Sequence, residues 1–244
     1  MELLAPAGSR QALTAAVQSG ADAVYLGGPQ FGARYSAENF TIEEMKTWVD
    51  YCHLYGVDVH VTANTLVKEK EFESLKEYLK QLNKIGVDAL IVQDMGAAEI
   101  IKKTVPDMTL HASTQMTQTG VYGSRLLKEL DATRIVTSRE MNLQEIKQLH
   151  ERLDVEIESF VHGALCYCYS GQCLLSSFNG GRSGNRGRCA QPCRMPYDVY
   201  DNGEKINDRN NSYALSPKDM CALQILPDVI DSGVYSLKIE GRMK

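Results

Sequence analysis

The sequence predicts an α/β protein of the TIM-barrel class, with eight parallel strands that alternate with helices. Three observations support this prediction: strand-like segments recur at regular intervals, helical patterns separate most of them, and they number eight. An open doubly wound sheet is the alternative, but such sheets more often have about five to seven strands. The expected strands lie near residues 2–5, 22–27, 57–62, 88–92, 108–112, 133–137, 155–161 and 235–239.

A repeated junction indicates the strand–helix alternation. Gly20, Gly56 and Gly86 each follow a helical pattern, and each is followed by a short β-rich run. Glycine favours the left-handed conformation that ends a helix, so each of these positions is expected to be a helix end. The intervals of 36 and 30 residues each fit one strand–helix unit.

The expected helices show their own start signals. Thr41 with Glu44, and Asn142 with Glu145, have the spacing of a capping box. Between residues 72 and 85 apolar side chains recur at steps of three and four, which predicts a helix with one buried face.

Composition excludes several classes of protein. Apolar residues make up 43% of the 244 residues and the net charge is −5, which is typical of a globular chain and not of a basic nucleic-acid coat. Neither a signal peptide nor a membrane-spanning run is present in the sequence, so we expect a cytoplasmic protein with reduced thiols and no membrane partner.

The expected connection between the seventh and eighth strands is unusually long. It runs from His162 to Val234, 73 residues, where about 25 would suffice by the repeat seen earlier. We therefore divide the chain into a barrel, residues 1–161 and 235–244, and a cysteine-rich insertion, residues 162–234, that leaves the carboxyl-terminal rim of the barrel. The chain stops directly after the eighth strand, which predicts that the last barrel helix is missing and that the sequence is truncated after residue 244. The last strand is expected to pair with the first.

Five of the seven cysteines lie between Cys166 and Cys193, within the insertion. Clustered thiols in a reduced compartment are typical of metal ligands, and the ligand candidates are Cys166, Cys173, Cys189 and Cys193. They leave 6, 15 and 3 residues between them, a loose spacing that favours an iron–sulfur cluster over zinc, while free structural cysteines are a third reading. Cys168 and Cys221 are left over, although Cys221 could replace one ligand.

Arginine and glycine alternate around these cysteines. From Ser159 to Tyr197 there is no acidic residue. Such a segment is typical of a phosphate or carboxylate site or of an RNA-contacting loop, although the arginines could equally balance the charge of a thiolate cluster. The arginines are Arg182, Arg186, Arg188 and Arg194.

Polar residues follow several expected strands, where a barrel places its active site. As a set they predict a polar cavity, and His111 is a candidate acid or base because its ordinary pKa lies near 6.5. No zinc-protease motif, nucleophile elbow or Walker loop occurs. The residues are Asn64, Gln93, Asp94, His111 to Gln115, Arg139, Glu140, His162 and Lys238 to Arg242.

Several longer motifs resemble those of peptidase family U32, and together they span the whole chain. Cys168 departs from the family pattern, and members of the family continue well past Arg242. The motifs are Leu4 to Gly8, His111 to Gln115, Glu158 to Cys166, Ser170 to Ser176, Asn185 to Gly187, Cys189 to Arg194, Ser216 to Met220 and Lys238 to Lys244.

The resemblance implies two different activities. The family is named for collagenase-like proteolysis of unassigned catalytic type. Other members are iron–sulfur proteins that hydroxylate tRNA uridine or ribosomal cytidine, with prephenate as hydroxyl source, or act in ubiquinone synthesis. Since no protease motif is visible, we favour hydroxylation of the tRNA wobble uridine to 5-hydroxyuridine, with a U32-type peptidase as the alternative and a non-catalytic scaffold as the third reading.

The expected site follows from that choice. The four cysteines would hold a 4Fe-4S cluster, with zinc as the alternative metal. The four arginines and Arg242 would bind substrate, while His111, His162 and Glu240 would act in catalysis. The expected partners are tRNA and a second family-member subunit.

Overall fold

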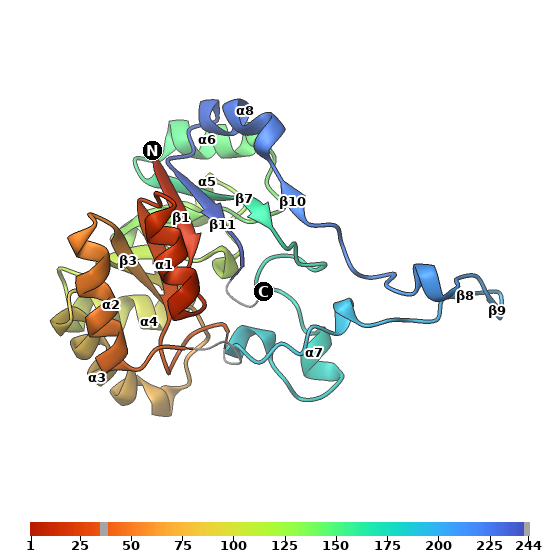
Figure 1. The fold of residues 1–244 in the computed structure, drawn as a ribbon, viewed down its shortest axis with the longest axis horizontal. Helices are drawn as coiled ribbons and strands as arrows, with labels where there is room; N and C mark the ends of the chain where they lie inside the picture. The colour runs from red at the N-terminus through yellow and green to blue at the C-terminus, as the bar shows by residue number, and fades with distance from the viewer. Residues whose placement is uncertain (35–38, 242–244) are drawn as a thin grey trace.

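The computed structural model describes residues 1–34 and 39–241 and contains the predicted barrel (Figure 1). Eight parallel strands close into a ring in the order β1, β2, β3, β4, β5, β6, β7, β11, and β11 pairs with both β7 and β1, as expected for the last strand. A ninth strand, β10, pairs antiparallel with β7. The barrel strands are β1 (Glu2–Pro6), β2 (Ala23–Gly27), β3 (Asp58–Ala63), β4 (Ala89–Val92), β5 (Thr109–Ala112), β6 (Ala132–Val136), β7 (Glu156–Gly163) and β11 (Ser236–Ile239).

Helices cover the outside of the ring (Figure 1). None follows β11 within residues 1–34 and 39–241, and none of the described helices is long and apolar enough to cross a bilayer. They are α1 (Arg10–Gln18), α2 (Ile42–Leu54), α3 (Phe72–Lys84), α4 (Met95–Thr104), α5 (Val121–Glu129), α6 (Leu143–Arg152) and α8 (Leu226–Asp231).

The local signals read from the sequence are confirmed. Thr41 and Asn142 are the N-caps of α2 and α6, and both form complete capping boxes with Glu44 and Glu145. The three junction glycines adopt φ values of 85°, 70° and 83° directly after helices, in the left-handed region that glycine reaches at little cost because it has no Cβ. On α3, the apolar stripe is buried against the sheet.

The interior of the barrel differs from its exterior. Outside the strands, a large apolar cluster packs the helices onto the sheet. Inside, a small separate cluster of apolar side chains is formed by Leu4, Ala23, Tyr25 and Ile91. Much of the remaining interior is polar, with Glu2, His60, His111, Arg134, Glu158 and Lys238 all buried. The charged members pair with one another, whereas the Nδ1 atoms of His60 and His111 have no hydrogen-bond partner among the described residues.

The insertion leaves the barrel after β7 and extends well away from it (Figure 1). It contains one helical turn, α7 (Leu175–Phe178), and a small hairpin of β8 (Tyr200–Asp201) and β9 (Glu204–Lys205). The chain rejoins the barrel earlier than residue 235, since β10 (Met220–Cys221) pairs with β7 and α8 packs against α6. The sequence could not show this return, because a two-residue strand and a six-residue helix have too few residues for a periodic pattern.

Candidate functional site

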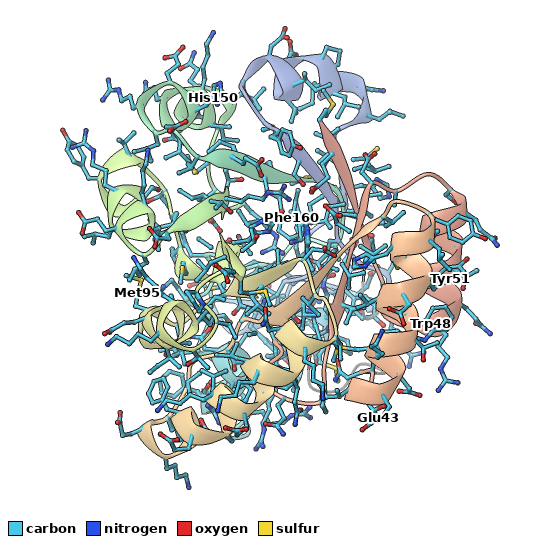
Figure 2. The ribbon with its side chains drawn as sticks, turned by 90° about the vertical axis from the view of Figure 1, so that its left-hand side faces the viewer. Glu43, Trp48, Tyr51, Met95, His150 and Phe160 are labelled. Atoms are coloured by element: carbon cyan, nitrogen blue, oxygen red, sulfur yellow. The ribbon has the colours of Figure 1, made fainter. Side chains whose placement is uncertain are left out.

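A cavity of about 240 Å³ lies at the carboxyl-terminal mouth of the barrel, where the insertion covers it. Its floor is formed by barrel residues, including the rings of Tyr25 and Phe160, and Phe160 lies near the centre of the barrel in Figure 2. Its roof comes from the first half of the insertion, residues 164–194. This rim is where barrels of this class place their active sites.

Hydrogen bonds hold the insertion on the rim. The Arg186 guanidinium makes two bonds to the Glu71 carboxylate, at 2.6 and 2.7 Å, and a third to the carbonyl oxygen of Leu66. The same charge-assisted contact lowers the pKa of Glu71 to about 2. On the opposite side, the backbone N–H of Ser170 donates to the Glu140 carboxylate at 2.9 Å, and the Thr117 hydroxyl donates to the Ser170 carbonyl at 2.7 Å.

Two glycines allow a close approach between the insertion and the rim. Gly171 and Gly187 both have positive φ, and a Cβ on either would collide with backbone of the barrel loops, at Gln115 and Gly32 respectively. These contacts explain why glycine stands at both positions.

The four predicted thiol ligands come together around this cavity. Cys166, Cys173, Cys189 and Cys193 all line it, and none forms a disulfide. Burial raises the pKa of Cys193, the other three thiols raise it further, and the neighbouring Arg194 lowers it, which places all five side chains within electrostatic reach.

The four thiols are a donor set of the kind that soft metals bind. Thiolates suit zinc and iron–sulfur clusters alike. Across the described ranges, no three His, Cys, Asp or Glu side chains converge closely enough to hold a single ion. The Gln191 N–H donates to the Cys189 sulfur at 3.3 Å, a contact typical of the outer shell of a metal-bound thiolate. Gln191 reaches this position in a left-handed conformation, φ 55°.

The cysteines outside the set lie elsewhere. Cys168 does not line the cavity, although its thiol contacts that of Cys173. Cys221 is exposed on β10, opposite His162, and also lies outside the cavity lining. Cys52 is fully buried in the apolar face of α2, as expected of a core residue, and burial raises its pKa to about 12.

Charged side chains form one wall of the cavity. Glu240, at the end of β11, accepts a hydrogen bond from Arg139 at 2.9 Å and a longer one from Arg34 at 3.4 Å. Beneath them, the Lys238 ammonium donates to Glu158 at 2.6 Å and lies 4.4 Å from the centre of the Tyr25 ring. Glu240 therefore lines the cavity, and its role in catalysis stays a prediction.

The two histidines expected to act in catalysis, His111 and His162, are not among the residues that line the cavity. His111 is 3% exposed inside the barrel, with its ring edge-on to that of His60 and the two ring centres 4.8 Å apart. Burial lowers the pKa of His60 to about 4 and holds that of His111 well below its ordinary value, so both rings are neutral at pH 7. A histidine at a strand end can face inward or outward, and the sequence did not show that this one sits a layer below the rim. His162 is exposed and does not contribute to the lining.

The predicted substrate-binding arginines separate into three groups. Arg186 is committed to Glu71, and Arg194 lines the cavity but bonds to Ser216 and to the carbonyl oxygens of Leu165 and Pro217. Arg182 and Arg188 are exposed on the insertion. Arg242 lies outside the described residues. Arg186 thus joins insertion to barrel, a correction that required knowing which segment faces Glu71.

Sequence reasoning missed one basic residue of the site and its aromatic floor. Arg34 follows β2 in a segment with no motif, and Tyr25 and Phe160 resemble ordinary strand residues. The only signal for Arg34 was its place just beyond a strand end, where barrels gather functional side chains.

Comparison with known proteins identifies relatives over the full chain. The model of peptidase family U32 matches residues 8–244. A "tRNA hydroxylation protein P1" of Bacillus subtilis is 41% identical, and a "23S rRNA 5-hydroxycytidine C2501 synthase" of Escherichia coli is 43% identical. A "Collagenase" of Porphyromonas gingivalis is 34% identical. Each alignment covers 100% of this chain but only 59%, 37% and 61% of the respective relative.

Solved structures agree on the fold. A structure described as a U32 peptidase superimposes with a TM-score of 0.66 over 99% of this chain and 93% of the other, at 17% identity. A thiamine phosphate pyrophosphorylase from Pyrococcus furiosus gives a TM-score of 0.52 at 11% identity, over 98% of this chain and 85% of the other. At such low identity these matches establish the barrel alone.

Proposed function

Because this chain belongs to peptidase family U32, we propose that it carries the reaction chamber of an RNA hydroxylase, with the wobble uridine of tRNA as substrate and 5-hydroxyuridine as product. The observation that carries the proposal is the meeting of four cysteines at one cavity in the mouth of the barrel. The names of the Bacillus subtilis and Escherichia coli relatives, both RNA hydroxylation proteins, support the same class of substrate.

In this proposal Cys166, Cys173, Cys189 and Cys193 hold a 4Fe-4S cluster. Bound there, the cluster would supply electron transfer next to the substrate. A cluster is favoured over zinc because the spacing of 6, 15 and 3 residues between the cysteines is loose and lacks the paired cysteines of a zinc knuckle. Prephenate is the proposed hydroxyl donor.

The surface around the cavity suits single-stranded RNA. Tyr169 lines the cavity yet is 64% exposed, and Tyr167 and Phe178 on the same segment are 59% and 82% exposed. Exposed rings of this kind stack on bases taken out of a helix, and Arg182 and Arg188 add positive charge on the same segment for phosphates. Tyr169 is the ring best placed to receive the base that enters the cavity.

Nucleoside analysis of tRNA tests the proposal. A deletion strain is complemented with wild-type protein, Tyr169→Phe or Tyr169→Ala, and 5-hydroxyuridine is measured by mass spectrometry. We expect wild type and Tyr169→Phe to restore the nucleoside, and Tyr169→Ala to lower it about tenfold, since stacking contributes about 1–3 kcal/mol per base. If the deletion strain keeps normal 5-hydroxyuridine, the proposed reaction is wrong.

Proteolysis is the second candidate because one relative is named a collagenase. A peptidase requires an activated nucleophile or metal-bound water. Among the described residues that line the cavity there is no histidine to serve as base for a thiol or hydroxyl. We therefore expect purified protein to leave denatured collagen intact. Cleavage that survives rigorous purification and disappears in Cys166→Ser would favour the peptidase instead.

A further inference from the structure

The charges inside the barrel fall into two levels. At the lower level, the Arg134 guanidinium donates a hydrogen bond to the Glu2 carboxylate at 2.9 Å, and the Lys238 ammonium donates one to the Glu158 carboxylate. Two buried cations thus meet two buried carboxylates, with half-exposed Glu156 as a further partner of Arg134. Burial alone would raise the pKa of Glu2, but Arg134 outweighs it and holds that pKa below its ordinary value. This level is electrically satisfied by the protein itself.

Among the described residues, the upper level, at the cavity, carries more positive than negative charge. Four basic side chains and one acidic side chain of residues 1–34 and 39–241 line the cavity: Arg34, Arg139, Arg194, Lys238 and Glu240. Lys238 is matched from below by Glu158, and Arg194 lies next to the thiols of the proposed cluster. That leaves the two guanidiniums of Arg34 and Arg139 facing the single carboxylate of Glu240, one of them at 3.4 Å.

Arg139 is held in a position that suits a planar anion. Its guanidinium stacks on the Phe160 ring, 4.4 Å from the ring centre, and its side chain is 13% exposed. Its Nε is buried and has no hydrogen-bond partner, which is costly unless a ligand or water supplies one. A stacked guanidinium with a free edge is the geometry that binds carboxylates in two-point fashion.

The surroundings indicate the size and character of the ligand. The wall and floor next to these arginines include the rings of Tyr25 and Phe160 and the side chains of Ile91 and Val136. A cavity of about 240 Å³ with apolar walls and convergent cations fits a small organic acid. A phosphodiester, which continues as a chain on both sides, fits such an enclosed floor less well.

We propose that Arg34 and Arg139 form a subsite for the carboxylate of a small co-substrate with an apolar body, and that Glu240 holds this subsite until the co-substrate's carboxylate competes for it. The inference rests on the proposed function only in taking the cavity as the reaction chamber. It assigns the small molecule to the barrel floor and leaves the exposed rings and arginines of the insertion to the RNA.

Ligand-observed NMR titration of the full-length protein tests the subsite. The probes are benzoate, its neutral isostere benzamide, inorganic phosphate and a tRNA anticodon stem-loop. We expect wild type to bind benzoate at least tenfold more tightly than benzamide, because the charge-assisted contacts require the carboxylate. Arg139→Gln should weaken benzoate about tenfold or more and leave stem-loop binding unchanged. Arg125→Gln, an exposed arginine on α5, is the matched control and should change neither.

The variant Glu240→Gln separates this proposal from a merely structural role. If Glu240 competes with the ligand, its replacement by Gln should strengthen benzoate binding several-fold. If Glu240 only holds the structure together, the same replacement should weaken benzoate binding. Circular dichroism at 222 nm checks that each variant is folded, and Arg139→Lys, which keeps the charge but loses the fork, should recover part of the affinity.

Three results would overturn the subsite. The first is no preference of wild type for benzoate over benzamide, and the second is unchanged benzoate binding in folded Arg139→Gln. The third is that Arg139→Gln loses stem-loop or phosphate binding instead of benzoate binding. The last result would assign these arginines to RNA phosphate. If benzoate binds as expected but the deletion strain retains 5-hydroxyuridine, the subsite stands and only the proposed reaction fails.

Discussion

The barrel and the insertion are stabilised by different interactions. The barrel has a continuous apolar cluster that packs its helices onto the strands. In residues 164–219, all of which the structure describes, no apolar side chain is buried, and Tyr200, Ile206 and Tyr213 are each about 60% exposed. The insertion is held on the rim by polar contacts such as Arg186 to Glu71.

The difference predicts which region a bound cluster would stabilise most. Apolar burial stabilises the barrel without help, at roughly 25 cal/mol per Å². A segment without a buried core has little to offset its conformational entropy. We infer that a cluster bound by the four cysteines would supply much of the order of the insertion, as metals do in small domains.

The largest expected effect is the loss of a thiol ligand. Cys173→Ser should remove the bound iron, abolish 5-hydroxyuridine formation and accelerate hydrogen exchange across residues 164–194, while exchange in α3 stays unchanged. Iron content, nucleoside analysis and hydrogen exchange measure the three effects. Cys168→Ser is the matched control, because Cys168 neighbours Cys173 but does not line the cavity.

If Cys173→Ser keeps its iron and its activity, the cluster assignment is wrong. If it loses iron but the insertion keeps its protection, the polar contacts alone order the segment, and the contrast between the two regions is weaker than we infer.

Acid should lower the free energy of unfolding of the barrel. His60 has a folded pKa of about 4, below its ordinary 6.5, so the unfolded chain takes up a proton that the folded barrel refuses. Stability should be complete above pH 6.5 and fall as pH drops from 6.5 towards 4, by roughly 3 kcal/mol from this residue. Urea denaturation at several pH values measures the loss.

A matched pair of variants assigns the acid effect. His60→Gln should reduce the pH dependence between 6.5 and 4 and leave the part that buried His111 contributes, whereas His150→Gln, an exposed histidine on α6, should leave the dependence unchanged. An equal slope in wild type and His60→Gln would mean that other groups cause the acid sensitivity.

The smallest effect should come from the contact that joins the two regions. Arg186→Ala removes the paired hydrogen bonds to Glu71 and should cost about 1–2 kcal/mol of local stability. Hydrogen exchange should rise in residues 183–190 and not in the strands. Arg186→Lys should recover only part of the protection, because an ammonium cannot form the paired contact. Equal exchange in Arg186→Ala and wild type would show that Arg186 is free for substrate.

Much of the barrel could be predicted from the sequence because its signals are local. The eight strands lie within one or two residues of their expected positions, and both capping boxes form as expected. The four cysteines were also identifiable as a set, since their chemistry and clustering point to a soft metal regardless of the fold. Glu240 was placed in the cavity because carboxyl ends of barrel strands meet at one rim.

What each polar side chain faces was decided by the tertiary structure. The sequence made His111 a candidate catalyst and Arg186 a substrate ligand. In the structure His111 lies edge-on to His60 inside the barrel, and Arg186 is paired with Glu71, 115 residues away. Arg34 entered the site through the closing of the ring, which brings the loop after β2 opposite Glu240. Periodicity and capping act over a few neighbouring residues, so they can be recognised from the sequence. Ion pairing depends on contacts between distant segments that only the closed barrel creates.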